Sequence, residues 1–311
     1  MWLLSEAGDF WIACAGGGVL LLALVLVLHW WGDWELGIAD ILLGELHLGA
    51  TYDAVVRGRL WRRMPLEVVV VPLGILAATY ALTYGGHTIL IATAALYLAA
   101  WHRGRQNLGI ARFYQHRIGG PVSSAHGGLF RAAIYLPMVA GVAYFASTAP
   151  DNEGEEYIGL GLDPAALWLL GILAVASLVA YLAFTLLCRD RVHPAERWLV
   201  VANAVAFGSA YVVGARSVSY ILVLALHHEI QYLYFTYATA RSSAVRTAGR
   251  PGDLRLLASF AVWPLIGLAS WAVCKFSDLP WLAPFLVAGL LCHYWLDGRI
   301  WTARARRLAI T

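Results

Sequence analysis

The sequence predicts an all-α, polytopic membrane helical bundle of about ten transmembrane helices in one domain, residues 1–311. Composition is the first reason: 60% of the 311 residues are hydrophobic and only 13% are charged, against roughly 25% charged in soluble domains. The second reason is that apolar residues come in blocks of about 20, which cross a ~30 Å hydrocarbon core. The third is that basic residues gather in alternate loops. With a net charge of +3, this pattern gives no support for nucleic-acid binding.

The apolar blocks predict the individual spans. Helices are expected because a lipid-exposed backbone must satisfy its own hydrogen bonds. The first block is expected to be a retained span and not a signal peptide, because residues 1–9 contain no lysine or arginine. The connection 103–128 starts with a segment that could extend the fourth helix beyond the membrane surface. The predicted spans are 10–31, 35–56, 65–84, 88–102, 131–148, 164–187, 197–214, 218–240, 255–275 and 281–300.

The basic residues set the predicted topology. With the N-terminus in the cytoplasm, 20 of the 22 lysines and arginines fall in cytoplasmic segments, and only Arg216 and Lys275 do not. The acidic loop 151–156 falls on the opposite side. This is the distribution that the positive-inside rule describes. We therefore expect an integral membrane protein with both termini in the cytoplasm, in a bacterial inner membrane.

Ionisable residues concentrate in four of the ten predicted spans. An ionisable side chain inside a span is costly, so by default it indicates a functional site. The second, fourth, eighth and tenth spans bring such groups to the interior or the cytoplasmic half of the membrane. The residues, with their amide and phenol neighbours, are Asp40, Glu45 and His47; His102 and Gln106; His227, His228, Glu229, Gln231 and Tyr232; and His293 and Asp297.

Spacing along these helices favours metal binding. Residues four apart share a helix face, and a histidine with an acid or amide one turn away is typical of a metal ligand and its neighbour in helical bundles. Of the adjacent histidines His227 and His228, which point about 100° apart, we favour His228 as a ligand together with Glu229. The pairs with this spacing are His102–Gln106, His227–Gln231 and His293–Asp297.

Charge balance narrows the choice of metal ion. Neutral histidines alone would leave two buried divalent ions with about four uncompensated charges, which buried carboxylates can offset. A mixed histidine and carboxylate set suits iron, manganese or zinc, and it exceeds the four ligands of one tetrahedral zinc. We expect two metal ions, with iron preferred. The expected ligands are His47, His102, His227, His228, Glu229, His293, Asp297 and Glu45, with Tyr232, Gln231, Gln106 and Asp40 as catalytic or orienting residues.

The remaining histidines have simpler interpretations. His29 and His87 are expected at the membrane interface, and His126 and His193 are expected in solvated loops. His116 is open between a cytoplasmic surface residue and a further metal ligand.

The histidines near the cytoplasmic ends of the hydrophobic helices are also similar to those of a known group of enzymes. In the placement of His102, His227, His228 and His293 the chain resembles the integral-membrane fatty-acid desaturase and hydroxylase group. That group gathers histidines in the same place to hold two irons. The similarity is one of chemistry, since the chain contains no HxxxH or HxxHH box. It implies a di-iron oxidoreductase or oxygenase acting on a lipophilic substrate, with a redox partner at the cytoplasmic face.

Other functional classes use the same residues. A proton-coupled transporter would use the histidines and acids as a relay, although the paired broken helices of inverted-repeat carriers are not apparent in the sequence. A b-type haem electron-transfer protein would use two histidines and leave the buried acids without a role. A zinc-dependent membrane hydrolase is a further alternative.

Overall fold

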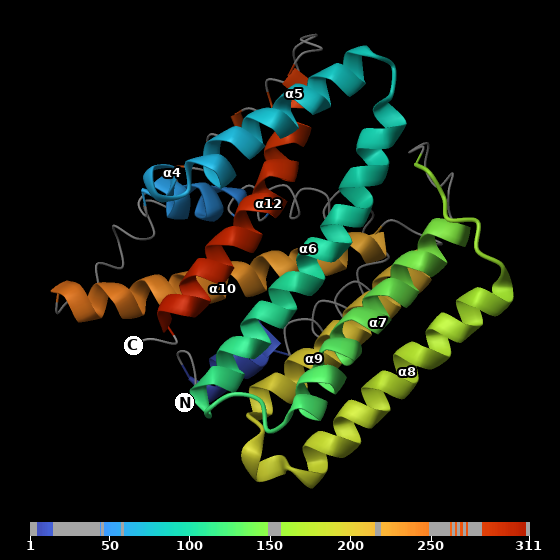
Figure 1. The fold of residues 1–311 in the computed structure, drawn as a ribbon, viewed down its shortest axis with the longest axis vertical. Coiled ribbons are helices and arrows are strands. Elements are labelled where there is room, and N and C mark those ends of the chain that lie inside the picture. Colours follow the sequence, from blue (N-terminus) through green and yellow to red (C-terminus); the bar gives the residue numbers. More distant parts are fainter. Residues whose placement is uncertain are drawn as a thin grey trace. The chain divides into compact units, whose positions relative to one another are not determined.

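The computed structural model describes residues 5–14, 44, 47–56, 59–148, 157–214, 219–248, 262, 265, 268, 269, 272 and 282–308. These residues form helices, turns and irregular connections, with no β-strand among them (Figure 1). The predicted all-α class is therefore confirmed for this part of the chain. Two compact units are present: the first comprises Met1–Gly37 and Ala100–Phe235, and the second comprises Ile38–Ala99 and Thr236–Thr311. A single domain over 1–311 stays a prediction.

The first unit is built around α7 (Ser124–Thr148). This helix packs against both α8 (Pro164–Leu187) and α9 (Pro194–Gly214), as Figure 1 shows. Its contact with α9 is close because Gly141 has no side chain: a Cβ there would stand 2.9 Å from the Phe207 carbonyl oxygen. Small residues at helix crossings let two backbones approach in this way.

Buried amides tie α6 (Thr88–Arg117) to the helices around α7. The Asn107 amide donates to Asn203 Oδ1 at 2.8 Å, and the Asn203 amide donates to the Ile134 carbonyl oxygen at 3.0 Å. Buried polar groups need such partners, and these bonds fix the orientation of α6 about its own axis. The same helix carries His102 and therefore presents that side chain in a fixed direction.

A buried acid anchors the N-terminal segment of the first unit. The segment forms α1 (Glu6–Gly8) and the π-helical turn η1 (Asp9–Cys14). Asp9 is fully buried and accepts hydrogen bonds from the hydroxyls of Tyr114 and Tyr234, at 2.7 and 2.8 Å. A carboxylate provides only acceptors, so two phenol donors suit it.

In the second unit, α12 (Leu282–Leu308) packs against η2 (Leu66–Val70) and α5 (Val71–Tyr84), the last of which lies beside it in Figure 1. The Trp295 indole N–H donates to the Glu67 carbonyl oxygen at 2.9 Å. This bond fixes the height of α12 along its neighbours and hence the height of the polar residues that α12 carries.

Residues 47–56 form a further helix that packs on α12 within the second unit. The Tyr52 hydroxyl donates to the Gly289 carbonyl oxygen at 2.8 Å, and Val55 forms a small core with Leu296 and Ile300. These contacts set the register between the two helices.

Three of the described helices are long and apolar enough to cross a membrane: Leu66–Tyr84, Ser124–Thr148 and Pro164–Leu187. The surface of α8 fits a lipid environment, because large apolar side chains are exposed along its whole length: Trp168, Ile172, Val175, Val179 and Leu187. So continuous an apolar surface is unusual for a soluble protein. These features agree with a membrane protein.

The predicted spans that lie mostly within the described residues each overlap a helix, but several bounds differ. The helix 164–187 has the predicted bounds, α7 begins at Ser124 and not at 131, and α6 continues past 102 to Arg117. Much of the first, second and ninth predicted spans lies outside the described residues. The count of ten spans therefore stays a prediction. The remaining short elements are α4 (Leu60–Arg63) and η4 (Arg189–Arg191).

Candidate metal centre

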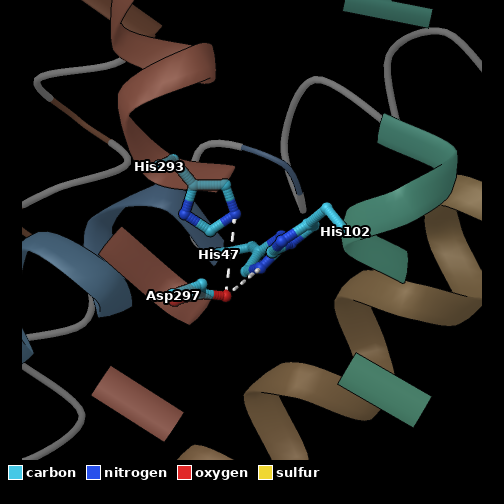
Figure 2. A group of neighbouring side chains, drawn as sticks. All are labelled: His47, His102, His293 and Asp297. Carbon is cyan, nitrogen blue, oxygen red and sulfur yellow. Dashed lines mark ion pairs between the residues drawn. The ribbon is translucent and has the colours of Figure 1, made fainter. Parts of the chain in front are cut away.

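Four buried side chains of metal-ligating types are drawn in Figure 2, and residues of this set could hold a metal ion: His47, His102, His293 and Asp297. Each is at most 5% exposed. Three of them, His47, His293 and Asp297, belong to the second unit and are called the ligand triad below. His102 belongs to the first unit and is described with its neighbours there.

In the ligand triad, one carboxylate oxygen faces two imidazoles. His293 and Asp297 lie one turn apart on α12, with His293 Nε2 at 3.9 Å from Asp297 Oδ2. His47, from the helix 47–56, places its Nε2 at 3.8 Å from the same oxygen, and Figure 2 marks both pairs with dashed lines. The two imidazole rings meet edge to face, with centroids 4.4 Å apart. Two helices thus bring three ligand-type atoms together.

The separations within the ligand triad suit a shared cation. At 3.8 and 3.9 Å the nitrogen–oxygen pairs are too long for direct hydrogen bonds. Two ligand atoms bound about 2.1 Å from one metal stand about 3.4 Å apart in a tetrahedron and at most about 4.2 Å apart. A metal ion between these atoms would need them to close by a few tenths of an ångström.

Thr51 orients the carboxylate of the ligand triad. Its hydroxyl donates to Asp297 Oδ1 at 2.7 Å, which leaves Oδ2 as the oxygen on the side of the two histidines. Hydrogen bonds of this kind fix a ligating carboxylate and tune a metal site. Sequence reasoning missed Thr51, although its spacing of four from His47 is the same signal that singled out His293 and Asp297.

In the first unit, His102 on α6 lies beside His228 on α10 (Ser219–Ala248). Their rings meet edge to face with centroids 4.9 Å apart. The Gln106 amide donates to the His228 carbonyl oxygen at 3.0 Å and to Gln231 Oε1 at 3.3 Å. Gln106 therefore joins the two helices through backbone and side chain. The expected role of Gln231 in holding a ligand imidazole stays a prediction.

The other expected site residues fall into two groups. His227, Glu229 and Tyr232 are buried on α10, as a site on that helix requires. Asp40 and Glu45 lie outside the described residues. His116 is exposed near the end of α6, which favours its interpretation as a surface residue.

The expectation that His126 and His193 are solvated is wrong, since they are only 1% and 5% exposed; the expected loop position is confirmed for His193 and wrong for His126. His126 lies in the first turn of α7, and its backbone N–H donates to the Ser123 hydroxyl oxygen at 3.1 Å. His193 directly precedes Pro194, the first residue of α9. Serine before a helix and proline at its first position are start signals, and they could have placed both histidines at helix ends.

His126 belongs to a second buried set, the hydrogen-bonded triad, with Tyr181 and Glu196. His126 Nε2 and the Tyr181 hydroxyl each lie 2.9 Å from Glu196 Oε1. The Val122 backbone N–H donates to His126 Nδ1 at 3.2 Å, so the ring proton lies on Nε2 and donates to Glu196. Burial raises the pKa of the Glu196 carboxyl, which precedes the predicted span 197–214, while its hydrogen bonds and His126 act in the opposite direction.

Comparison with protein-family models, curated proteins and solved structures finds no match to this chain. The function is therefore inferred from the chemistry of the ligand triad. Two imidazoles and one carboxylate with room for further ligands are typical of non-haem Fe(II) sites, and a similar set holds catalytic zinc.

Proposed function

We propose that this chain is a membrane-embedded, metal-dependent oxidoreductase that acts on a lipophilic or membrane-associated substrate. The observation that supports this best is the position of Asp297 Oδ2, which lies 3.8 Å from His47 Nε2 and 3.9 Å from His293 Nε2. The apolar helices add support for the substrate class, because a membrane-embedded protein meets lipophilic molecules directly.

Iron is the metal that we propose for the ligand triad. When bound, iron supplies one-electron and dioxygen chemistry that the protein side chains lack. His47 and His293 would bind it as neutral imidazoles through Nε2, and Asp297 would offset one positive charge. Thr51 holds the carboxylate through Oδ1. Since all four side chains are at most 5% exposed, bulk water is kept from the site.

A second iron is part of the proposal, as expected from the number of ligand-type residues in the sequence. Its proposed ligands are His102, His228 and Glu229 of the first unit. The adjacent rings of His102 and His228 and the burial of Glu229 support this choice. Electrons would come from a redox partner at the cytoplasmic face.

Ten spans, with both termini in the cytoplasm of a bacterial inner membrane, complete the proposal. Support comes from the distribution of charge, because 20 of the 22 basic residues fall on one side under this topology.

Metal analysis of the detergent-purified protein, with a visible absorption spectrum, tests the function. We expect stoichiometric iron in the wild type and in the control His87→Ala, which removes an exposed imidazole. His47→Ala and His293→Ala should each lose metal, because each removes a bond to the ion. His102→Ala and His228→Ala should lose part of the iron if a second ion is bound.

Other results would support a different function. A Soret band would indicate a haem protein, and bound zinc without iron would favour a hydrolase. A wild type that carries no stoichiometric metal would favour a proton-coupled carrier and contradict the proposal.

A further inference from the structure

An aromatic and basic surface lies on α6 and α7 within the first unit. Trp101 stacks on Tyr135, with ring centroids 5.2 Å apart and planes inclined by 13°. The Arg105 guanidinium carbon lies 5.9 Å from the centre of the Trp101 ring, within range of a cation–π contact. Trp101 is 47% exposed, so the stacked pair is accessible from outside.

Two further arginines lie on the same two helices. Arg112 and Arg131 are exposed, as Arg105 is, and all three guanidinium groups act electrostatically on the Tyr135 phenol. On α6, Trp101, Arg105 and Arg112 lie within about 40° of one another around the helix axis. On α7, Arg131 and Tyr135 are one turn apart. The α6–α7 arginine surface is thus defined as Trp101, Arg105, Arg112, Arg131 and Tyr135.

Neighbouring helices offer little negative charge to this surface. Residues 100–148, which include the first-unit part of α6 and all of α7, contain no aspartate or glutamate, and neither does α8. The acid that α9 brings, Glu196, is buried and hydrogen-bonded to His126 and Tyr181. Three exposed guanidinium groups therefore create a positive field next to apolar, lipid-type helix surface.

We propose that the α6–α7 arginine surface binds the phosphate headgroup of an anionic phospholipid. Arginine presents several N–H donors in a planar fork that matches phosphate oxygens. Tryptophan and tyrosine side chains are enriched at the headgroup level of membranes. Basic pockets between membrane helices are known sites for anionic headgroups. The acyl chains would lie along the exposed apolar side chains of α8, such as Trp168 and Leu187.

Native mass spectrometry of the full chain from nanodiscs tests the proposal. The nanodiscs contain phosphatidylcholine with or without phosphatidylglycerol, and retained lipid is identified. We expect preferential retention of phosphatidylglycerol by the wild type. The triple variant Arg105→Gln/Arg112→Gln/Arg131→Gln should bind it on the order of a hundredfold more weakly, about fivefold for each arginine. Arg131→Gln alone should give an intermediate loss. These side chains are exposed, so folding should be preserved.

The control removes the same charge elsewhere. Arg59, Arg62 and Arg63 are also exposed, and their triple glutamine variant should keep the preference for phosphatidylglycerol. An equal loss in this control would reduce the effect to overall charge and overturn the proposal. Wild-type retention by the α6–α7 triple variant would overturn it as well. So would displacement of the lipid by inorganic phosphate, which would indicate a site for a soluble anion.

Discussion

The ligand triad and the hydrogen-bonded triad both place histidine beside a carboxylate in the interior of a helical unit. In the hydrogen-bonded triad, His126 and Tyr181 each approach one oxygen of Glu196 to 2.9 Å. In the ligand triad, His47 and His293 remain 3.8 and 3.9 Å from one oxygen of Asp297. The residue types are similar, and about 1 Å of separation distinguishes them.

This difference indicates different roles. At 2.9 Å the two donors of the hydrogen-bonded triad bond Glu196 Oε1 directly, so this set joins α7, α8 and α9 as a structural element. At nearly 4 Å the atoms of the ligand triad are too far apart for direct hydrogen bonds, and they could hold an ion between them if they closed by a few tenths of an ångström. Burial and residue type alone would have assigned the two sets the same function, whereas the distances separate them.

Metal removal should produce the largest difference between variants of the two triads. A metal held at a thousandfold its Kd stabilises the folded protein by about 4 kcal/mol. We expect a chelator to lower the melting temperature of the wild type and of His126→Ala, and to lower that of His293→Ala less, because that variant has already lost the ion of the ligand triad. A chelator response in His293→Ala equal to that of the wild type would place the metal elsewhere.

His126→Ala should test the structural role of the hydrogen-bonded triad. It removes a hydrogen bond to a buried carboxylate and also the acceptor of the Val122 N–H. We expect a loss of about 1–3 kcal/mol of stability, measured by thermal or denaturant unfolding in detergent, with metal content unchanged. Metal loss in this variant at a temperature where it remains folded would mean that the hydrogen-bonded triad is not merely structural.

Thr51→Val should weaken metal binding without removing a ligand. It keeps the shape of the side chain and removes the donor to Asp297 Oδ1. Loss of such a partner typically weakens metal affinity by about 10–100-fold, which competition with a calibrated chelator can measure. Affinity equal to that of the wild type would show that Thr51 only fills space beside the carboxylate.

Features that depend on local sequence patterns could be predicted, and features that depend on packing between distant segments could not. The helix 164–187 and the pairing of His293 with Asp297 follow from apolar length and helical periodicity, which are local. The approach of His47 to Asp297 requires the helix 47–56 to pack on α12, and the sequence predicted only that both helices carry ligand-type residues. The bond from His126 to Glu196 joins residues 70 positions apart, and no local pattern encodes such a contact.

The metal content of two matched variants tests the central claim most directly. Asp297→Asn and Glu196→Gln each replace a buried carboxylate by an amide of the same shape, one in each triad. We predict that purified Asp297→Asn loses the metal ion of the ligand triad while Glu196→Gln retains the wild-type amount. Wild-type metal in Asp297→Asn, or an equal loss in both variants, would contradict the assignment of the ligand triad as the metal site.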